Sequence, residues 1–305
     1  MKPMKIADKV YYIGPDENES SHVSAGILIN SSPKIYIDIY IGEDETVKLL
    51  AEEKPDIAFL SHHHIDHTRF LPLIKEYSNA ELIVPEGEEN YLTDFNFFEK
   101  KTAGPSYSST EKWNLYFKEL SNYKPINDFK TQMDRDKFKS GNVTLECIKA
   151  AGHSPSHTVF NIPSEKILFA SDIGIGGFGP WYGWLDCNLT DYIESILMLK
   201  SLDIDMLITS HDGFFIKDIK HEWDKCLRHF FKREQFVKES LNKGKTKDEI
   251  IDYGIYFLNK SKVPDPMNFI ITLWDSIMFD HHKNQLENEP LEKLFPELSN
   301  RLLSM

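Results

Sequence analysis

The first two thirds of the chain alternate between apolar runs of strand length and stretches with helical spacing. The strand-length runs are rich in β-branched residues and end at clusters of proline, asparagine and serine. They cover 10–13, 23–29, 35–41, 57–61 and 82–85. Apolar residues three and four positions apart predict helices over 43–54 and 70–77. This alternation predicts an α/β domain built in layers.

The segment 86–138 differs from its surroundings. It combines many aromatic and charged residues without a clean hydrophobic period. We expect a helical insertion in the layered domain, and two interpretations of its rings stay open. The rings either pack onto the core or form a lid that lines a substrate pocket. They belong to Tyr91, Phe95, Phe97, Phe98, Tyr107, Trp113, Tyr116, Phe117 and Tyr123.

Strands return after the insertion, and the end of the chain is helical. The expected elements are strands at 143–150, 157–162, 167–170 and 206–209, with a helix over 191–202. From about residue 218 onward the pattern is helical. Thr246 and Glu249 fit a capping box before a helix over 250–258, and 269–282 is a second amphipathic stretch.

Length and composition allow one large core with an appendage. The chain has 305 residues, of which 41% are hydrophobic, and this is enough apolar material for a single large core. We therefore assign residues 1–217 to the layered domain. Residues 218–305 form a C-terminal helical region that we expect to pack on that domain.

The chain is acidic, with 35 lysines and arginines against 48 aspartates and glutamates and a net charge of −13. An acidic surface repels phosphate backbones and anionic lipid headgroups. We therefore expect a small-molecule substrate as partner and neither nucleic acid nor membrane. A homo-oligomer stays open.

The cysteines indicate a reducing compartment. Cys147, Cys187 and Cys226 lie far apart and form no CxxC pair, so we expect buried thiols rather than a disulfide framework or a zinc finger. No apolar stretch has the length of a signal peptide or a membrane span. The expectation is a soluble cytoplasmic protein.

The strongest chemical signal is the segment Ser61-His62-His63-His64-Ile65-Asp66-His67. It follows an expected buried strand and precedes an expected helix. Residues two apart in an extended strand end face the same way, so His62 and His64 can bind one ion together. Asp66 and His67 follow the turn toward the helix and can face a second ion. Imidazole and carboxylate are ligands of zinc, iron and manganese.

With its later motifs, this segment resembles the metallo-β-lactamase fold superfamily. Gly152-His153, Ser171-Asp172 and Ser210-His211 each follow an expected strand in the order that the family shows, and Tyr36-Ile37-Asp38 is similar to its early strand ending in Asp. The resemblance spans about residues 10–215. It implies a four-layer αββα sandwich, here with a helical insertion and C-terminal helices.

The resemblance also implies a ligand set for two divalent metal ions, zinc first, with iron or manganese as alternatives. His62, His64 and His153 would hold one ion, Asp66, His67 and His211 the other, and Asp172 would bridge them. Two such cations lower the pKa of a shared water from near 16 toward about 7, so that hydroxide forms at neutral pH. Asp66 is the candidate catalytic residue, because it could also pass a proton to the leaving group.

Residues around these motifs are assigned more modest roles. We expect His63 and Asp38 to be structural, Asp38 as a hydrogen-bond acceptor beneath the site. His157 either orients a ligand or strand or simply packs. His281 and His282 are expected at the surface, with a contribution to the pocket as the alternative. Asp212 is a candidate cap for the turn after His211.

A glycine-rich stretch over 174–179 matches G-x-G-x-x-G after a strand. It continues into Pro180 and Trp181 instead of opening a helix, so the context of a dinucleotide site is missing. Because the stretch follows Asp172 directly, its aromatic residues are candidate pocket walls, with core packing as the alternative. They are Phe178, Trp181, Tyr182 and Trp184.

The function expected from the resemblance is hydrolysis of a carbonyl-centred bond in an ester, lactone or thioester of a small, partly apolar substrate. Gly152 to His157 resembles the corresponding segment of lactonase-like members, with Ser156 where glycine is usual. Thr68-Arg69-Phe70 departs from the glycine pair of glyoxalase II-like thioesterases. Alternatives are a phosphodiesterase with the same site, an iron-dependent oxidoreductase similar to sulfur dioxygenases, and a ligand-binding protein with little turnover.

Overall fold

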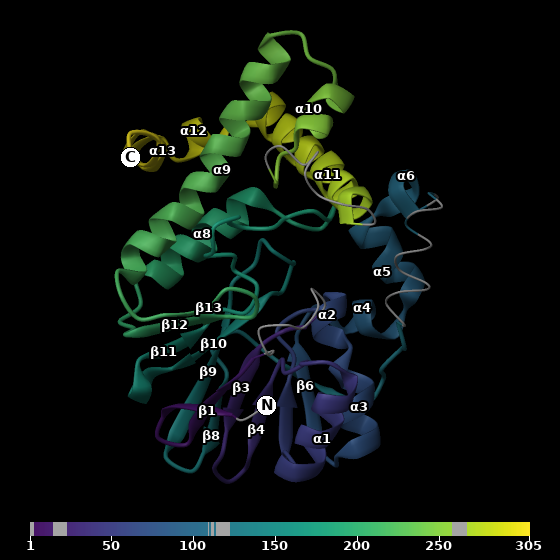
Figure 1. Ribbon diagram of the computed structural model, residues 1–305, viewed down its shortest axis with the longest axis vertical. Coiled ribbons are helices and arrows are strands. Elements are labelled where there is room, and N and C mark those ends of the chain that lie inside the picture. The colour runs from purple at the N-terminus through teal and green to yellow at the C-terminus, as the bar shows by residue number, and fades with distance from the viewer. Residues whose placement is uncertain (1–2, 15–22, 109, 111–112, 114–122, 258–266) are drawn as a thin grey trace.

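Two sheets packed face to face form the lower half of the molecule as drawn in Figure 1. The computed structural model describes residues 3–14, 23–108, 110, 113, 123–257 and 267–305. Within these residues the first sheet runs in the order β1 (Met4–Ala7), β2 (Val10–Ile13), β3 (Gly26–Ile29), β4 (Ile35–Ile37), β5 (Ile57–Phe59), β6 (Glu81–Pro85) and β7 (Lys130–Gln132). The second runs in the order β13 (Gly213–Phe215), β12 (Met206–Thr209), β11 (Ile167–Phe169), β10 (Thr158–Ile162), β9 (Val143–Lys149) and β8 (Lys137–Ser140).

Strand direction changes within each sheet. β1 to β4 are antiparallel, whereas β4 to β7 pair in parallel. In the second sheet β11 and β12 are parallel and the other pairs are antiparallel. The carboxyl ends of β5, β11 and β12 therefore lie toward the same edge of the sandwich, where open α/β sheets place ligands.

The apolar residues divide into three layers of packing. Inward-facing side chains of both sheets, such as Ile37 and Phe169, form one buried cluster. The outer face of the first sheet packs against α1 (Glu43–Glu53) and α3 (Phe70–Tyr77). The outer face of the second packs against α8 (Leu189–Lys200) and α9 (Ile219–Asn242). This arrangement confirms the expected four-layer αββα sandwich.

The insertion is helical over its first part. It contains α4 (Glu89–Thr93), α5 (Phe95–Thr102) and α6 (Gly104–Ser108), and Tyr91, Phe98 and Trp113 are buried in the same hydrophobic cluster as residues of α8 and α9. The helical prediction for 86–138 was too long, because β7 and the start of β8 belong to the sheets. Of the aromatic residues named above, Tyr116 and Phe117 lie outside the described residues.

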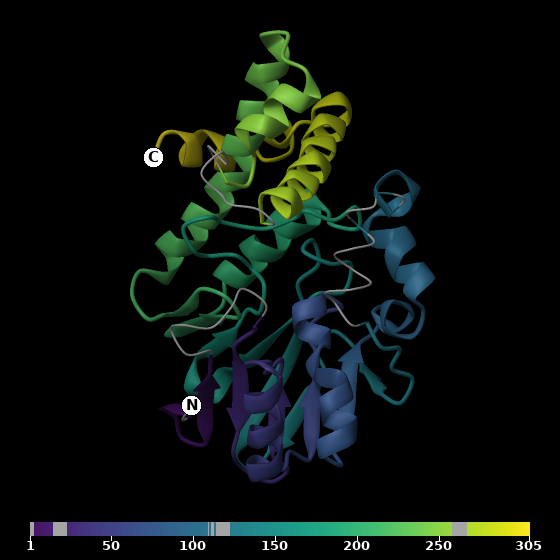
Figure 2. The same cartoon turned by 45° about the vertical axis from the view of Figure 1, so that its right-hand side comes forward.

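The C-terminal helices lie above the edge of the sandwich, and both views show α9 and α11 there (Figures 1 and 2). α9 is followed by α10 (Lys247–Tyr253), α11 (Met267–Asn288), α12 (Leu291–Leu294) and α13 (Pro296–Leu303). The capping box of Thr246 and Glu249 is present at the start of α10. No described helix is both long and apolar enough to span a bilayer.

The sequence pattern did not predict the four strands at the ends of the sheets. β7 and the start of β8 fell within the expected insertion, and β1 and β13 are short. Phe214 of β13 is 43% exposed and packs edge-on against Tyr12, with ring centroids 6.0 Å apart. Such strands bury too little apolar surface to give a clear alternation.

Phe230 of α9 lies where the C-terminal region packs on the core, so its replacement tests this packing. Its ring stacks on Tyr182 at 5.3 Å and meets the edge of Tyr192 at 5.2 Å, and it is fully buried. We expect Phe230→Ala to lower the free energy of unfolding by about 3–5 kcal/mol, because it leaves a cavity among these rings. Urea denaturation measures this. The exposed Lys232→Ala on the same helix should change it by less than about 0.5 kcal/mol, and equal effects of the two would contradict the packing.

Candidate metal centre

The histidine-rich segment leaves the end of β5 in an extended conformation. His64 has φ −63° and ψ 151°, and α2 (Ile65–Thr68) begins directly after it. His62 and His64 therefore project to the same side, with ring centroids 4.4 Å apart. The helical turn then brings Asp66 and His67 round to the neighbouring side of the cluster.

The remaining candidate ligands come from the second sheet. His153 lies in the turn between β9 and β10, Asp172 follows β11, and His211 follows β12. Gly152 has φ +127°, and a Cβ there would lie 2.2 Å from the Cα of Tyr192, so the turn that carries His153 requires glycine. The structure brings all seven predicted side chains into two adjoining groups.

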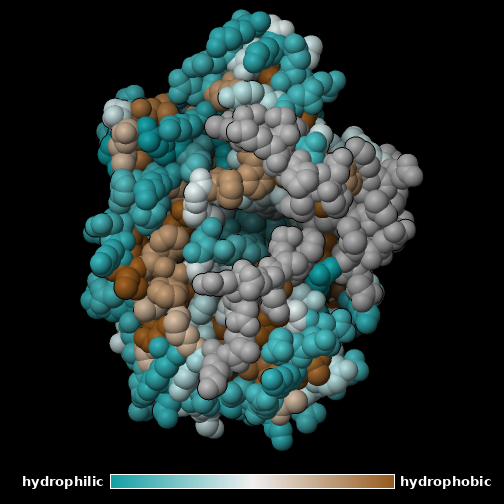
Figure 3. Space-filling view, in the orientation of Figure 1, coloured by the Kyte–Doolittle hydropathy of each residue, from teal (hydrophilic) through white to brown (hydrophobic). Residues whose placement is uncertain are grey.

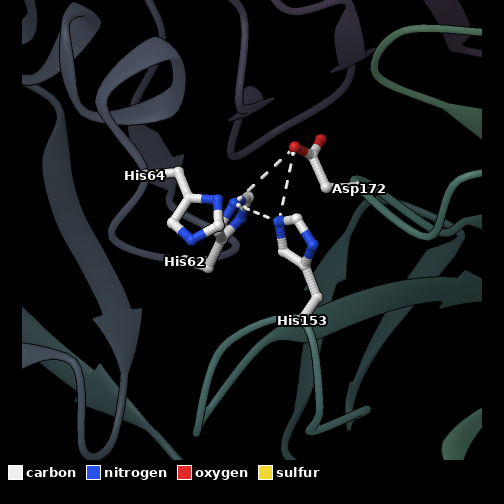
Figure 4. A group of neighbouring side chains, drawn as sticks. All are labelled: His62, His64, His153 and Asp172. Atoms are coloured by element: carbon white, nitrogen blue, oxygen red, sulfur yellow. Dashed lines mark hydrogen bonds and ion pairs between the residues drawn. The ribbon is translucent and has the colours of Figure 1, made fainter. Parts of the chain in front are cut away.

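The first group contains His62, His64, His153 and Asp172, whose donor atoms lie within 4.8 Å of one another (Figure 4). The Nε2 atoms of His62 and His153 are 3.2 Å apart. Oδ2 of Asp172 is 3.8 Å from the first and 3.5 Å from the second. The three rings and the carboxylate point toward a common centre.

The second group contains Asp66, His67, Asp172 and His211. Nε2 of His211 lies 3.1 Å from Oδ2 of Asp66 and 3.2 Å from Oδ2 of Asp172. Nε2 of His67 lies 2.9 Å from Oδ1 of Asp172. Asp172 thus belongs to both groups, in the position that the sequence assigned to a bridging ligand.

Hydrogen bonds at Nδ1 of two histidines indicate which ring nitrogen of each faces the cluster. Nδ1 of His153 donates to the carbonyl of Trp181 at 3.1 Å, and Nδ1 of His67 donates to the carboxylate of Asp38 at 3.0 Å. In a neutral imidazole the other nitrogen then carries a lone pair. Nε2 of His64 is buried without a hydrogen-bond partner, whereas Nε2 of His67 faces Oδ1 of Asp172. A buried polar atom without a partner is costly, and these atoms fit divalent metal ions that accept nitrogen and oxygen ligands.

Charge separates the histidines into two kinds. Burial and the neighbouring imidazoles hold the pKa values of His62 and His64 well below the ordinary value. Burial raises the pKa of Asp172, but His211 and His67 outweigh it and hold this pKa well below its ordinary range. Burial lowers the pKa of His211, but the carboxylates of Asp172 and Asp66 raise it to about 10. The cluster therefore has two carboxylates that stay ionised and attract positive charge.

Asp38 lies beneath the cluster, as expected, and is fully buried. Its Oδ1 accepts from the Ser61 backbone N–H at 2.8 Å, and its Oδ2 accepts from Ser171 Oγ at 3.1 Å as well as from His67. A carboxylate behind a histidine fixes which nitrogen is protonated and how the ring is oriented.

His157 and His63 both support the cluster from outside it. Nε2 of His157 accepts from the backbone N–H of Asp172 at 3.3 Å, so it orients a candidate ligand rather than only packing. His63 is buried between the carboxylates of Glu88 and Asp186 and stacks on Tyr91 at 3.7 Å. Burial lowers the pKa of His63, but these carboxylates raise it to about 9. The structural role expected for His63 is confirmed.

A cavity of about 560 Å³ opens above the cluster. Figure 3 shows this face hollowed, with hydrophilic residues deep in the hollow. His64, Asp66, His153, Asp172 and His211 line its floor. The cluster is therefore open to a small molecule on one side.

Three of the four predicted wall residues line the cavity, namely Phe178, Trp181 and Trp184. Tyr182 does not, since it is fully buried beneath the loop. The expectation of surface histidines at 281 and 282 was wrong. His282 is buried and shares a hydrogen bond of 2.8 Å with the Tyr182 hydroxyl, and His281 donates to the Trp184 carbonyl at 2.7 Å.

Sequence reasoning missed the wall residues of the C-terminal region, which are Tyr256, Phe257, Ile270 and Trp274. The amphipathic pattern over 269–282 was visible, but it cannot say what the apolar face of a helix covers. Asp212 was expected to cap its own turn. Instead its carboxylate accepts from the backbone N–H groups of Ile175 and Gly176 at 3.2 and 3.0 Å and anchors the glycine-rich loop.

Comparison with known proteins identifies the family of the chain. Residues 32–211 match the family model described as the metallo-beta-lactamase superfamily. The chain belongs to this superfamily. No curated protein matches the chain at a significant level.

Solved structures of the superfamily share the fold at low identity. A metallo-beta-lactamase family protein from Thermus thermophilus has a TM-score of 0.67 at 16% identity, over 93% of this chain and 95% of its own. A beta-lactamase domain protein from Burkholderia ambifaria has a TM-score of 0.66 at 15% identity, over 93% and 87%. An archaeal superfamily protein from Sulfolobus tokodaii has a TM-score of 0.56 at 16% identity, over 90% and 98%.

The shared position of Asp172 in both groups generates a prediction about metal content. We expect the protein loaded with zinc to hold about two equivalents. His64→Ala and His211→Ala should each hold about one, because each lies in one group, whereas Asp172→Ala should hold less than one. Elemental analysis by mass spectrometry measures the content, and His221→Ala, an exposed histidine of α9, is the control. Two equivalents retained by Asp172→Ala would contradict its shared position.

Proposed function

We propose that the protein is a metal-dependent hydrolase that cleaves an ester, lactone or thioester bond of a small, partly apolar substrate. The observation that carries this proposal is the arrangement of seven ligand-type side chains, five of which line the floor of a cavity whose upper wall is aromatic. A substrate in that cavity would present its reacting group to the cluster and its apolar part to the rings.

The two groups would hold one divalent ion each. His62, His64 and His153 would bind the first, Asp66, His67 and His211 the second, and Asp172 both. Such a pair of ions, zinc first and iron or manganese otherwise, lowers the pKa of water and polarises a substrate oxygen. The protein contributes the fixed orientation of these ligands through Asp38, Ser61 and His157.

The cavity wall supports a carbonyl substrate over a phosphodiester. Among the described residues lining it, Arg69 is the only arginine or lysine, and tryptophan, phenylalanine, tyrosine and isoleucine cover the upper part. A site for a charged phosphodiester backbone is expected to carry more cations. The acidic net charge of −13 also disfavours a phosphodiester substrate.

Asp66 is positioned to handle a proton. Its Oδ2 lies 3.1 Å from Nε2 of His211, its side chain is 26% exposed, and it lines the cavity. A carboxylate at the boundary between the cluster and the substrate space can accept a proton from water and pass it to a leaving group. We assign it this role in addition to its place in the second group.

A panel of lactones, thioesters, aryl esters and phosphodiesters tests the function on protein of known metal content. We expect turnover of at least one carbonyl substrate. His64→Ala and Asp172→Ala should each lower kcat/KM by more than ~100-fold, because metal-assisted water activation supplies most of the acceleration. Turnover of phosphodiesters alone would reject the carbonyl substrate, and a coloured iron protein that consumes oxygen with a persulfide would reject hydrolysis.

Asp66→Asn tests the proton transfer. In protein that keeps both metals, we expect kcat to fall about 10²-fold for alkyl esters, whose leaving group needs a proton, and much less for aryl esters with acidic leaving groups. Steady-state kinetics with metal content measured on the same samples checks this. Unchanged kcat for alkyl esters at full metal occupancy would remove the role.

A further inference from the structure

We propose that the upper wall of the cavity is a binding subsite for an aromatic group that the substrate carries within one or two bonds of its reacting carbonyl. The wall is defined by Phe178, Trp181, Tyr256, Phe257 and Trp274. The inference rests on the proposed function for the identity of the reacting group, whereas the subsite itself can be tested by binding alone.

A continuous series of ring contacts leads from the metal centre to the cavity mouth. His64 and His153 contact Trp181, with ring centroids 5.2 and 5.5 Å apart. Trp181 meets the edge of Trp274 at 5.5 Å, and Trp274 meets the edge of Tyr256 at 6.3 Å. The reacting group and the start of the aromatic wall are therefore neighbours, and this limits the spacer between them.

The series ends at Phe178, which is 59% exposed. Its ring is held edge-to-face against Phe257 at 4.4 Å and lies 6.2 Å from Tyr256. Edges and faces of several rings around one space favour a further ring, because edge-to-face and offset contacts add to the free energy gained from area burial. An exposed ring fixed by its neighbours loses little entropy when a ligand covers it.

The wall is held in place by buried charges behind it. Arg233 of α9 donates to the carbonyls of Pro180 and Phe178, each at 2.5 Å, and its guanidinium lies over the rings of Tyr182 and Tyr256, at 5.3 and 5.1 Å from their centroids. Arg233 therefore connects the two segments that carry the wall. A planar guanidinium suits this position because it donates in two directions and stacks on aromatic faces.

Asp275 of α11 holds the second segment in the same way. Its Oδ1 accepts from the backbone N–H groups of Ile255 and Tyr256 at 3.0 and 2.8 Å, and Asp275 is fully buried. Both charges are directed at the backbone behind the wall. The cavity side of the wall stays apolar, and its shape is set before a ligand binds.

The test compares the binding of three probes to metal-loaded protein. Binding is measured by the fluorescence of the cavity tryptophans and by calorimetry. The probes are acetate, phenylacetate and cyclohexylacetate, which share a carboxylate for the metal centre and differ in the group beside it. We expect phenylacetate to bind at least about 10-fold more tightly than acetate, and more tightly than cyclohexylacetate. Equal affinity for acetate and phenylacetate, or for phenylacetate and cyclohexylacetate, would overturn the aromatic subsite.

A matched pair of variants locates the binding. Phe178 and Phe214 are both exposed phenylalanines, and only Phe178 lines the cavity. We expect Phe178→Ala and Trp274→Ala to weaken phenylacetate about 3- to 10-fold with acetate unchanged, and Phe214→Ala to change neither. Loss of phenylacetate affinity in Phe214→Ala to the same extent would overturn the location.

Arg233→Lys tests the positioning role. It keeps the positive charge, but its ammonium cannot reproduce the two-directional donation of the guanidinium. We expect KM for phenylacetate esters to rise about 5-fold or more with kcat and metal content within about 2-fold. A fall in kcat with KM unchanged would overturn the positioning role.

The two proposals fail separately. If the wild type binds phenylacetate as expected but turns over none of the carbonyl substrates, the hydrolase assignment fails and the aromatic subsite stands. If the wild type hydrolyses small acetyl esters as fast as phenylacetyl esters and binds both acids equally, the hydrolase assignment stands and the subsite fails.

Discussion

The carboxylate of Asp38 joins the two sheets at the point where the candidate metal centre lies. It accepts from the Ser61 backbone and the His67 ring on one sheet and from Ser171 on the other. Asp38 and Ser171 both have positive φ values, 52° and 48°, which for such residues cost of order 1 kcal/mol each. Strained backbone at both of these positions indicates that the network around them determines the conformation.

This network is needed because the cluster is unfavourable by itself. The donor atoms of seven imidazole and carboxylate groups converge, and burial adds the cost of lost hydration. Packing between the sheets and the hydrogen bonds of Asp38 and His157 hold them there. The fold thus holds these side chains in an arrangement that a cation can bind without rearrangement, as expected of a preorganised metal site.

The sequence predicted the floor of the site almost completely. The spacing of His62, His64, Asp66 and His67 at a strand end has few structural interpretations, and His153, Asp172 and His211 follow later strands in the same order. Local spacing predicted the first four of these residues at a strand end, and the resemblance to the metallo-β-lactamase superfamily supplied the other three. Spacing alone does not tell that strand ends of two different sheets meet.

The wall could be predicted only in part, for a physical reason. Phe178, Trp181, Tyr182 and Trp184 lie in an irregular loop, where no period tells which ring faces the cavity, and Tyr182 proved to be buried. His281 and His282 look like surface residues at the end of a helix until α9 and the loop cover them. Which apolar faces meet across more than 70 residues of sequence is a property of tertiary packing, and local patterns do not contain it.

The different origins of floor and wall have a consequence for the substrate. The floor depends on strand ends that the sandwich fixes, whereas the wall combines one loop of the core with the C-terminal segment. Asp212, Arg233 and Asp275 surround this wall, yet each directs its charge at backbone groups. The charged floor and the apolar wall can therefore each recognise a different part of one molecule.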